Sequence, residues 1–373
     1  MKALLIGQFI EPPFAEGGVN VILNWVKASH LAGVNITVLS LSSRFSGSRR
    51  IFGVDFEYIK TDKPRFQSNL IDSLPIQMAA LKRLDFDIVH FASSIDGLSA
   101  IPVLSILKLQ KHKIISSYLT NDCFSRFTPF FSNFMFHVVT VPSKRMFSSF
   151  IEKKIAPEKM ILLPSCVDEN YFCPRDKIEA REKLGLKEGY FIIFSVGHFR
   201  RGRLIIPLIK LINEMIGKGA KIQLIIGWTG QGEKDCIDEI FSMARKNQLI
   251  KIIPPTENIN LYYNASDIYV LSAGSDYVIE TPLSLLEAAS SGVPALAFNI
   301  NGSSEIIQDG QTGYIIKENN FDEMELKINQ LKDNVQLLNE MSKNSRKLAL
   351  SSFSYERTGP QLSNLYNKLA DQS

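Results

Sequence analysis

The sequence predicts an α/β protein made of two doubly wound, Rossmann-like domains. The first observation is length, because 373 residues are too many for one ordinary core and enough for two domains of this class. The second is pattern: short runs rich in Ile and Val alternate with longer amphipathic stretches, as in parallel βαβ units. The third is that this alternation is found in each half of the chain, without low-complexity segments.

The first half begins with an apolar run that ends at Glu11 and Pro12. A signal peptide needs a longer apolar stretch and a small-residue cleavage site, so we interpret this run as the first strand. The next element is a helix predicted over 19–32. The strands predicted in this half are 3–7, 36–41, 88–91, 113–117 and 138–141.

The second half repeats the pattern after a break at 164–174, where two prolines and several polar residues interrupt the apolar runs. We therefore divide the chain into a first domain over 1–168 and a second domain over 169–353, followed by a last amphipathic helix within 354–373. The strands predicted in the second domain are 191–196, 222–226, 250–253, 268–271 and 294–298, with helices at 204–218 and 283–291.

The composition is that of a soluble globular protein, with 45% apolar and 21% charged residues. No run of eighteen apolar residues is present, which argues against a membrane span. The four cysteines form no CxxC pair and have no histidine at zinc-finger spacing. We interpret them as unpaired buried thiols of a reducing compartment and expect the protein in the cytoplasm. They are Cys123, Cys166, Cys173 and Cys236.

Charge is unevenly distributed along the chain, whose net charge is only +4. Residues 1–165 carry 19 Lys/Arg against 12 Asp/Glu, a net charge of +7, and the remainder has a net charge of −3. Such a basic half fits contact with anionic lipid at the inner face of a membrane, or with a phosphorylated acceptor. The alternative is scatter along solvated faces, which the absence of a dense Lys/Arg block favours. We expect no nucleic-acid partner.

The first candidate ligand site follows the first predicted strand, where a loop leads to Gly17 and Gly18 at the start of a helix. Open parallel sheets bind ligands at the carboxyl ends of their strands, and a helix N-terminus presents free N–H groups to an anion. Two glycines allow a phosphate to approach the backbone closely. Taken alone, however, a Gly-Gly pair is more typical of a plain tight turn.

The second candidate is 197–203, which has the same strand-to-loop placement in the second half. It contains His198 and three arginines, Arg200, Arg201 and Arg203. A guanidinium can bind a diphosphate through two parallel charge-assisted hydrogen bonds. Solvated arginines are the alternative. Basic residues at a helix start oppose the helix dipole, however, so we expect an anion to compensate them.

The third candidate, 279–294, is the strongest of the three. Thr281 is a suitable N-cap, and Pro282 is favoured at the first helical position. The unpaired N–H groups of Leu283 and Ser284 are then expected to point out of the helix end, where an anion can accept them.

Two glutamates accompany this helix start. Glu280 lies just before it, and Glu287 lies about two turns inside the helix. A carboxylate on a helix can accept hydrogen bonds from both hydroxyls of a ribose, as acidic residues do in dinucleotide sites. An exposed helix glutamate is the alternative for Glu287, but its apolar neighbours Leu286 and Ala288 make an idle carboxylate costly.

Two further patterns are interpreted as structural. Asp85 and Asp87 look like the paired-aspartate metal site of some sugar transferases. Asp87 opens a buried strand, however, and no other carboxylate cluster supports a cation, so we predict no metal site. The aromatic stretch 127–136 could form a membrane-facing or acceptor-facing patch, although core packing is the more frequent explanation for such a stretch.

Together these segments resemble the retaining GT-B glycosyltransferases of the group 1, family 4-like type. The resemblance runs nearly from end to end, and its last three blocks are the most specific. The similar blocks are Gly17-Gly18-Val19, FDIVH (86–90), VTVPSK (139–144), PEKMILLPSCVDENYF (157–172), GHFRRG (197–202), LYYNASDIYVL (261–271), ETPLSLLEAASSGVPALAF (280–298), GSSEIIQDGQTGYII (302–316) and FSYERTG (353–359).

The resemblance implies two Rossmann-like domains facing across a cleft, with the last helix packed back on the first domain. It implies transfer of a hexose from a nucleotide-diphosphate sugar, bound by the second domain, to a glycan or lipid-linked acceptor, bound by the first. The anomeric configuration is expected to be retained, without a metal or other cofactor. Hydrogen-bond donors aimed at the leaving diphosphate would stabilise the charge that develops there.

The resemblance also implies roles for individual residues. Glu287 would bind the donor ribose, and Glu280 would lie near the transferred sugar. The donor-binding residues so implied are Gly17, Gly18, His198, Arg201, Arg203, Leu283, Ser284 and Glu287, and the catalytic residues are Glu280 and Arg201.

Three departures from the family pattern concern the catalytic detail. Six residues instead of seven separate the two glutamates, and Ile279 occupies the aligned place. The diphosphate loop is short, with His198 where an arginine is common, and the histidine often found within 116–122 is absent. These departures keep open a degenerate scaffold that binds a nucleotide sugar or a partner without transfer, and a sugar-nucleotide epimerase on the same fold is a weaker third option. The arginines and Glu287 count against the scaffold.

Overall fold

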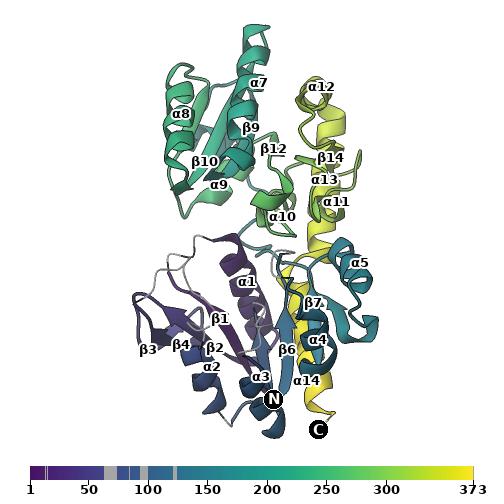
Figure 1. Cartoon of the computed structure of the whole chain (residues 1–373). Helices are drawn as coiled ribbons and strands as arrows, with labels where there is room; N and C mark the ends of the chain where they lie inside the picture. Colours follow the sequence, from purple (N-terminus) through teal and green to yellow (C-terminus); the bar gives the residue numbers. More distant parts are fainter. Residues whose placement is uncertain are drawn as a thin grey trace. The chain divides into compact units, whose positions relative to one another are not determined.

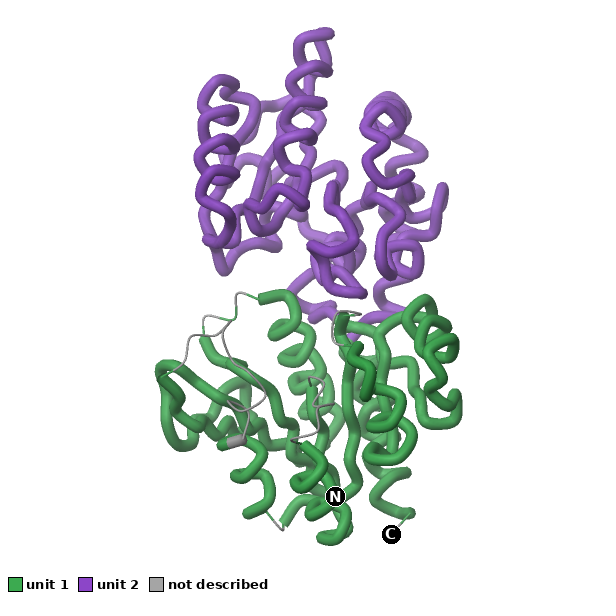
Figure 2. The backbone as a smooth tube through the Cα atoms, in the orientation of Figure 1, with its two compact units in different colours: residues 1–166, 355–373 green, residues 167–354 purple. Residues whose placement is uncertain are grey.

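The computed structural model describes residues 1–12, 14, 16–62, 74–83, 85–92, 100–120 and 124–372. The chain divides into two compact units, Met1–Cys166 with Tyr355–Ser373, and Val167–Ser354 (Figure 2). The sequence placed the boundary after residue 168, whereas the first unit ends at Cys166. Cys123 and the last two residues of 116–122 lie outside the described part of the chain.

The described part of the first unit contains an eight-stranded sheet in the order β3-β4-β2-β1-β5-β6-β7-β8. Its paired strands are parallel, except that β3 is antiparallel to β4. All five strands predicted in this half are present, and β3, β4 and β8 were missed. The strands are β1 (Lys2–Gln8), β2 (Asn35–Ser42), β3 (Gly47–Ile51), β4 (Val54–Lys60), β5 (Ile88–Phe91), β6 (Lys113–Ser117), β7 (Val138–Val141) and β8 (Met160–Leu162).

The helices of the first unit form two groups. Helices α1 and α14 pack against each other (Figure 1), and α14 also contacts β5. The other group shares one hydrophobic core with the sheet, in which Leu104, Phe131 and Phe150 are fully buried. The helices are α1 (Gly17–Leu31), α2 (Leu74–Leu81), α3 (Ile101–Leu109), α4 (Thr128–Phe130), the π-helix η4 (Phe131–Met135), α5 (Lys144–Glu152), the 3₁₀ turn η5 (Pro157–Lys159) and α14 (Tyr355–Ala370).

A buried polar network anchors α14 to this sheet. His90 of β5 hydrogen-bonds the hydroxyl of Tyr366 through Nδ1 at 2.7 Å and the hydroxyl of Ser117 through Nε2 at 2.6 Å. Burial lowers the pKa of His90 to about 3, so the imidazole is neutral at physiological pH. A neutral ring can donate from one nitrogen and accept at the other, which satisfies both contacts without burying a charge.

The second unit contains a six-stranded parallel sheet in the order β11-β10-β9-β12-β13-β14. This is the strand order of a doubly wound domain, with its switch point between β9 and β12. The five strands predicted in this half are present, and the edge strand β14 was missed. The strands are β9 (Phe191–Phe199), β10 (Ile222–Gly232), β11 (Ile250–Ile253), β12 (Ile268–Leu271), β13 (Ala295–Phe298) and β14 (Gly313–Ile316).

The predicted end of the first strand of this unit was wrong. Strand β9 continues to Phe199, because β10 pairs with it past a bulge between Trp228 and Gly232. His198 therefore lies in the strand and not in the loop. The helical elements of the unit are α6 (Lys177–Lys183), η6 (Arg201–Arg203), α7 (Ile205–Gly217), α8 (Lys234–Arg245), α9 (Ile259–Ala265), η7 (Ser275–Tyr277), α10 (Leu283–Ser290), α11 (Ser303–Ile306), α12 (Phe321–Asp333) and α13 (Val335–Ser352).

The cysteine prediction holds in part. Cys166 and Cys236 are buried, but Cys173 is partly exposed. Cys173 lies in the connection between β8 and α6, and its thiol donates a hydrogen bond to the carbonyl of Asn170. This connection runs near the surface, so a buried position was the wrong expectation for Cys173.

Candidate functional site

Two loops meet at the switch point of the second unit. The turn η6 follows β9 and the turn η7 follows β12, and these two strands are neighbours in the sheet. The amide of Gly274 donates to the carbonyl of Gly202 at 2.8 Å and so joins the loops. A Cβ at Gly202 would overlap the ring of Tyr277, so the loops approach this closely because residue 202 is glycine.

Arg201 is held by acidic side chains of the same unit. Its guanidinium forms ion pairs with Asp235 at 2.8 Å and Glu239 at 2.7 Å, both on α8. Hydrogen bonds to Asp235 and then Glu239 raise the pKa of the Arg201 side chain above its usual value. The anion expected to compensate this arginine is thus supplied by α8. The predicted catalytic and diphosphate-binding role of Arg201 would require it to exchange these partners for the ligand.

Arg203 differs from Arg201 in its surroundings. Its guanidinium packs against Gly197 so closely that a Cβ there would lie 2.9 Å from a guanidinium nitrogen. Burial lowers the pKa of Arg203, and its Nε is buried without a hydrogen-bond partner. Within the described chain no carboxylate forms an ion pair with this arginine. Arg203 is therefore a partly exposed residue with a largely desolvated guanidinium at the switch point, where a doubly wound domain binds its ligand.

His198 contacts the neighbouring strand. Its Nδ1 lies 2.5 Å from the hydroxyl of Thr229 on β10. Since Thr229 belongs to the extended part of β10, this contact accompanies the longer pairing of the two strands. The predicted role of His198 in donor binding stays a prediction.

The start of α10 differs from the prediction by one residue. The helix begins at Leu283, and Pro282 is the N-cap, with an extended ψ of 116° and no side-chain hydrogen bond to the helix. Thr281 is therefore not the N-cap, and Pro282 is not in the first turn. Because a proline side chain cannot cap, the first-turn amides of Leu283 and Ser284 receive no hydrogen bond from the N-cap side chain. These first-turn donors are arranged for an anion.

Glu287 lies in the second turn of α10 and is partly exposed. Its Oε2 accepts a hydrogen bond of 2.8 Å from the hydroxyl of Tyr263 on α9, which also contacts the carbonyl of Ser284 at 3.3 Å. Burial raises the pKa of the Glu287 carboxyl to about 7, and the hydrogen bond from Tyr263 opposes that rise. Sequence reasoning missed Tyr263, because nothing in the Tyr262-Tyr263 pair indicates which ring faces α10.

Tyr269 connects these groups electrostatically. This buried residue of β12 interacts with both Arg203 and Glu287, which act on its pKa in opposite directions, and it hydrogen-bonds Ser284. Burial is the larger effect and raises the pKa of Tyr269 to about 12. The cation, the carboxylate and the first turn of α10 thus surround one side chain. The structure brings together Arg203, Ser284 and Glu287, which the sequence proposed separately.

Glu280 is a buried residue of the loop before α10. Only 2% of its surface is exposed, whereas Ile279 is partly exposed. The carbonyl of Glu280 accepts the amide of Gly302 at 2.8 Å, which fixes this loop against the segment that follows β13. Its predicted position beside the transferred sugar stays a prediction.

In the first unit, Gly17 and Gly18 are the first two residues of α1. The predicted start at residue 19 was therefore late, and the pair is helical and not a separate tight turn. The N-cap, Glu16, makes no side-chain hydrogen bond to the helix, and the first turn contains no acidic residue. The helix start follows the carboxyl end of β1, as a phosphate-contacting segment requires. Contact with a donor phosphate stays a prediction.

Other polar groups have structural contacts. Asp87 accepts the backbone N–H of Lys2 at 2.7 Å, and the ammonium of Lys2 lies 3.5 Å from Asp85. Among the residues that the structure describes, no three His, Cys, Asp or Glu side chains are placed to hold a metal ion. Within the same ranges, no helix has both the length and the hydropathy to cross a membrane.

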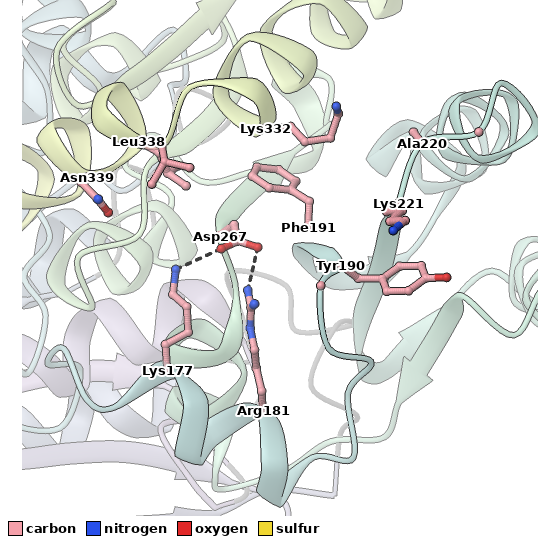
Figure 3. A pocket seen from close by; sticks show the side chains of 13 residues that line it. Lys177, Arg181, Tyr190, Phe191, Ala220, Lys221, Asp267, Lys332, Leu338 and Asn339 are labelled. Carbon is pink, nitrogen blue, oxygen red and sulfur yellow. Dashed lines mark hydrogen bonds and ion pairs between the residues drawn. The ribbon is translucent and has the colours of Figure 1, made fainter.

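A pocket of about 550 Å³ lies at the other edge of the second unit's sheet, where strands begin (Figure 3). Asp267 lies in its wall and forms ion pairs with Lys177 at 3.1 Å and Arg181 at 2.7 Å. It also accepts the backbone N–H of Ile192 at 2.7 Å. These contacts join α6 to the starts of β9 and β12, so we interpret the cluster as structural.

Comparisons with known proteins agree with this geometry. The family model described as glycosyl transferases group 1 matches residues 176–348. An uncharacterized glycosyltransferase of Haemophilus influenzae is 25% identical over 353 residues, which are 91% of this chain and 94% of that one. The UDP-Gal:alpha-D-GlcNAc-diphosphoundecaprenol alpha-1,3-galactosyltransferase of Escherichia coli is 26% identical over 219 residues, covering 58% of this chain and 56% of that one.

The fold is also that of solved proteins. The Anabaena protein Alr3699/HepE, crystallised with UDP-glucose, superposes with a TM-score of 0.77 at 16% identity, covering 99% of this chain and 100% of that one. The matched family segment contains η6, α9 and α10, which carry Arg203, Tyr263 and Glu287. The chain therefore has the GT-B fold of glycosyltransferases, and its residues 176–348 match the glycosyl transferases group 1 family.

Proposed function

We propose that the protein transfers a hexose from a nucleoside diphosphate sugar to a glycan or lipid-linked acceptor, with retention of the anomeric configuration. The observation that carries the proposal is Arg203, a desolvated guanidinium without an ionic partner in the described chain, at the switch point of the second unit. A cation that is largely desolvated and has no counter-charge is costly. A diphosphate supplies that charge and accepts the fork of guanidinium hydrogen bonds.

The proposed donor complex uses the groups gathered around Tyr269. Arg203 and the first-turn amides of α10 bind the diphosphate, and Glu287 accepts hydrogen bonds from the ribose hydroxyls. As the bond between the anomeric carbon and the β-phosphate oxygen breaks, negative charge builds on that phosphate. Donors fixed before the reaction stabilise this charge without a reorganisation cost, so we expect transfer to require no metal ion.

The names of similar proteins support the two substrate classes. The relative from Escherichia coli is named for a UDP-sugar donor and an acceptor linked to diphosphoundecaprenol, and the Anabaena protein was crystallised with UDP-glucose. In our proposal the second unit binds the donor, and the first unit, with Gly17 and Gly18, contributes to the acceptor side and to phosphate contact.

A scaffold that binds a nucleotide sugar without transfer is the second candidate. One observation favours it: Arg201, a predicted catalytic residue, is bound to Asp235 and Glu239. Arg203 does not separate the two candidates, because both bind the diphosphate of a nucleotide sugar, so only a measurement of transfer decides between them.

A donor screen followed by a turnover assay tests the proposal. UDP-, GDP-, ADP- and dTDP-hexoses are compared by thermal shift, since a ligand at a hundred times its Kd adds about 2.7 kcal/mol of stability. Labelled donor is then offered with glycan and polyprenyl-diphosphate acceptors, and the anomer of the product is determined by NMR. Failure of every donor to bind would refute the proposal. Binding without transfer would favour the scaffold, and an inverted product would refute retention.

The variant Glu287→Ala tests the proposed contact with the ribose. If Glu287 accepts both ribose hydroxyls, this variant weakens donor binding by about 1.5–3 kcal/mol, measured by calorimetry. An unchanged Kd in the folded variant would show that the carboxylate does not contact the donor.

A further inference from the structure

The aromatic stretch 127–136 is divided between core and surface. Phe131, Met135 and Phe136 belong to the hydrophobic core of the first unit, as core packing predicts. Phe130 and Phe134 do not, because 45% and 66% of their surfaces are exposed. Their rings lie 5.7 Å apart, so they form one exposed aromatic pair on α4 and η4.

Topology places other exposed apolar side chains beside this pair. Helices α3, η4 and α5 each lead to the start of the next parallel strand, β6, β7 and β8 respectively. The C-terminal ends of α3, η4 and α5 therefore all lie beside the N-terminal ends of the strands in the sheet. At those ends lie Leu109, with 83% of its surface exposed, Phe134, and Ile151, with 43% exposed. Ile106, one turn before the end of α3, is also exposed, at 40%.

Hydrogen bonds show that these ends are adjacent. The ammonium of Lys108 on α3 donates to the carbonyl of Phe134 at 2.5 Å. The amide of Asn133 on η4 donates to the carbonyl of Lys154, which follows α5, at 3.0 Å. Lys154 in turn bonds the carbonyl of Ile151. Ile106, Leu109, Phe130, Phe134 and Ile151 thus form one region, here called the aromatic–lysine surface.

The charge around this surface is strongly positive. Residues 100–163 carry nine Lys/Arg and three Asp/Glu, so this segment supplies most of the basic excess of the first half. Burial and, to a smaller extent, the positive charges of Lys108, Lys113 and Lys159 together lower the pKa of His137 to about 4. These lysines therefore produce a positive potential at the edge on which the apolar side chains stand.

We propose that the aromatic–lysine surface attaches the protein to an anionic lipid bilayer, with its phenylalanines at the level of the headgroups. Interfacial attachment combines exposed aromatic and aliphatic side chains with a rim of lysines, which is the combination found here. Leu109 and Phe134 protrude from the protein, which suits a deformable lipid surface. A second copy docked by a two-fold axis would bring lysines against lysines and is disfavoured.

Attachment at the N-terminal ends of the strands leaves the C-terminal ends of the strands free to bind other molecules. The N-terminus of α1, with Gly17 and Gly18, lies there, after the carboxyl end of β1. The bilayer and the phosphate-binding segment would therefore use different surfaces of the first unit. The proposal does not depend on sugar transfer and can be tested without a substrate.

Vesicle sedimentation tests the proposal with the full chain. We expect binding to vesicles with about 30% phosphatidylglycerol at low salt, at least tenfold weaker binding to pure phosphatidylcholine, and loss of binding as salt screens the lysines. Phe130→Ser with Phe134→Ser should weaken binding to anionic vesicles at least tenfold. The matched control, Leu326→Ser with Leu350→Ser, removes equally exposed apolar side chains from α12 and α13 and should bind like the parent.

Charge is tested by a second pair of variants. Lys111 and Lys154 are exposed and closely follow α3 and α5, so Lys111→Gln with Lys154→Gln should weaken binding about fivefold for each charge removed. The exposed pair Lys210→Gln with Lys246→Gln should not weaken binding. Unchanged melting temperatures show that the variants are folded. Absence of binding to anionic vesicles, or equal binding by the phenylalanine and leucine variants, would overturn the proposal. So would a dimer, detected by light scattering, that the phenylalanine variant abolishes, because it would assign the surface to a second copy.

Discussion

The hydroxyl of Tyr263 donates a hydrogen bond to Oε2 of Glu287 at 2.8 Å, across the contact between α9 and α10. Tyr263 is fully buried and its ring packs on Phe194, so the donor is fixed by the core of the second unit. This bond favours the ionised carboxylate, while burial favours the protonated form. The balance holds the pKa of Glu287 at about 7, well above the ordinary value for a glutamate.

The first prediction concerns the pH dependence of donor affinity. Only the ionised carboxylate accepts freely from both ribose hydroxyls, so binding of UDP-glucose should strengthen as pH rises through about 7. Tyr263→Phe removes the bond that lowers the pKa, so the midpoint should move up by about one pH unit. Calorimetry across the pH range measures the midpoint. Tyr262→Phe is the control. An unchanged midpoint in Tyr263→Phe would show that Tyr263 does not set the pKa on which ligand binding depends.

The second prediction concerns the stability of the ligand-free protein. Between pH 4.5 and 7 the folded state keeps a proton on Glu287 that the unfolded state has lost, so this group destabilises the fold increasingly as pH rises through that window. The full effect is about 3 kcal/mol and is present above pH 7. Glu287→Gln should therefore raise the melting temperature at pH 8 and leave it nearly unchanged at pH 5. The exposed Glu340→Gln should match the parent at both values, and equal curves for all three proteins would contradict the prediction.

The third prediction distinguishes the roles of Arg201 and Arg203, which lie in the same turn, η6. Arg203→Met removes a desolvated cation, so it should weaken binding of a nucleoside diphosphate tenfold to a hundredfold and leave binding of the nucleoside unchanged. It should also stabilise the ligand-free protein. Arg201→Met should have little effect on diphosphate affinity, because Arg201 is bound to Asp235 and Glu239. Titration of both variants with the nucleoside diphosphate and with the nucleoside measures these affinities. A larger loss of diphosphate affinity in Arg201→Met than in Arg203→Met would assign the diphosphate to Arg201.

The fourth prediction concerns Glu280. If it acts on the transferred sugar, Glu280→Gln lowers turnover at least tenfold with donor affinity nearly intact, the pattern of a group that acts on the transition state. Ile279→Ala, at the neighbouring position, should retain turnover. Melting curves are needed beside the kinetics, because Glu280 is buried and could instead stabilise the loop before α10. Parental turnover in Glu280→Gln would place the residue outside the site.

The fifth prediction is that transfer needs no divalent cation. Hydrogen-bond donors fixed at the diphosphate would take the place of a metal. Turnover in excess EDTA should equal turnover in magnesium or manganese. Complete loss in EDTA, restored by either ion, would contradict it.

Much of this protein could be read from local sequence pattern. Apolar runs such as Ile268–Leu271 and Ala295–Phe298 are continuous because strands buried on both faces of a parallel sheet need apolar side chains at each position. The edge strand β3 could not be predicted in this way, because its residues are almost all exposed and the strand forms only by pairing with β4. The position of the site at the strand ends could likewise be predicted from local sequence, because it depends on which residues follow a strand or begin a helix.

The sequence by itself determined the two-domain α/β fold, the strands that form its core and the segments that carry the site. Only tertiary structure decided which arginine lacks a partner, because Asp235 and Glu239 reach Arg201 from a helix more than thirty residues away. It also decided that Tyr263 holds Glu287 and that Phe130 and Phe134 are exposed while Phe131 is buried. The physical reason is that charge state and exposure depend on neighbours in space. Pattern along the chain fixes which residues start an element, but not which groups surround it.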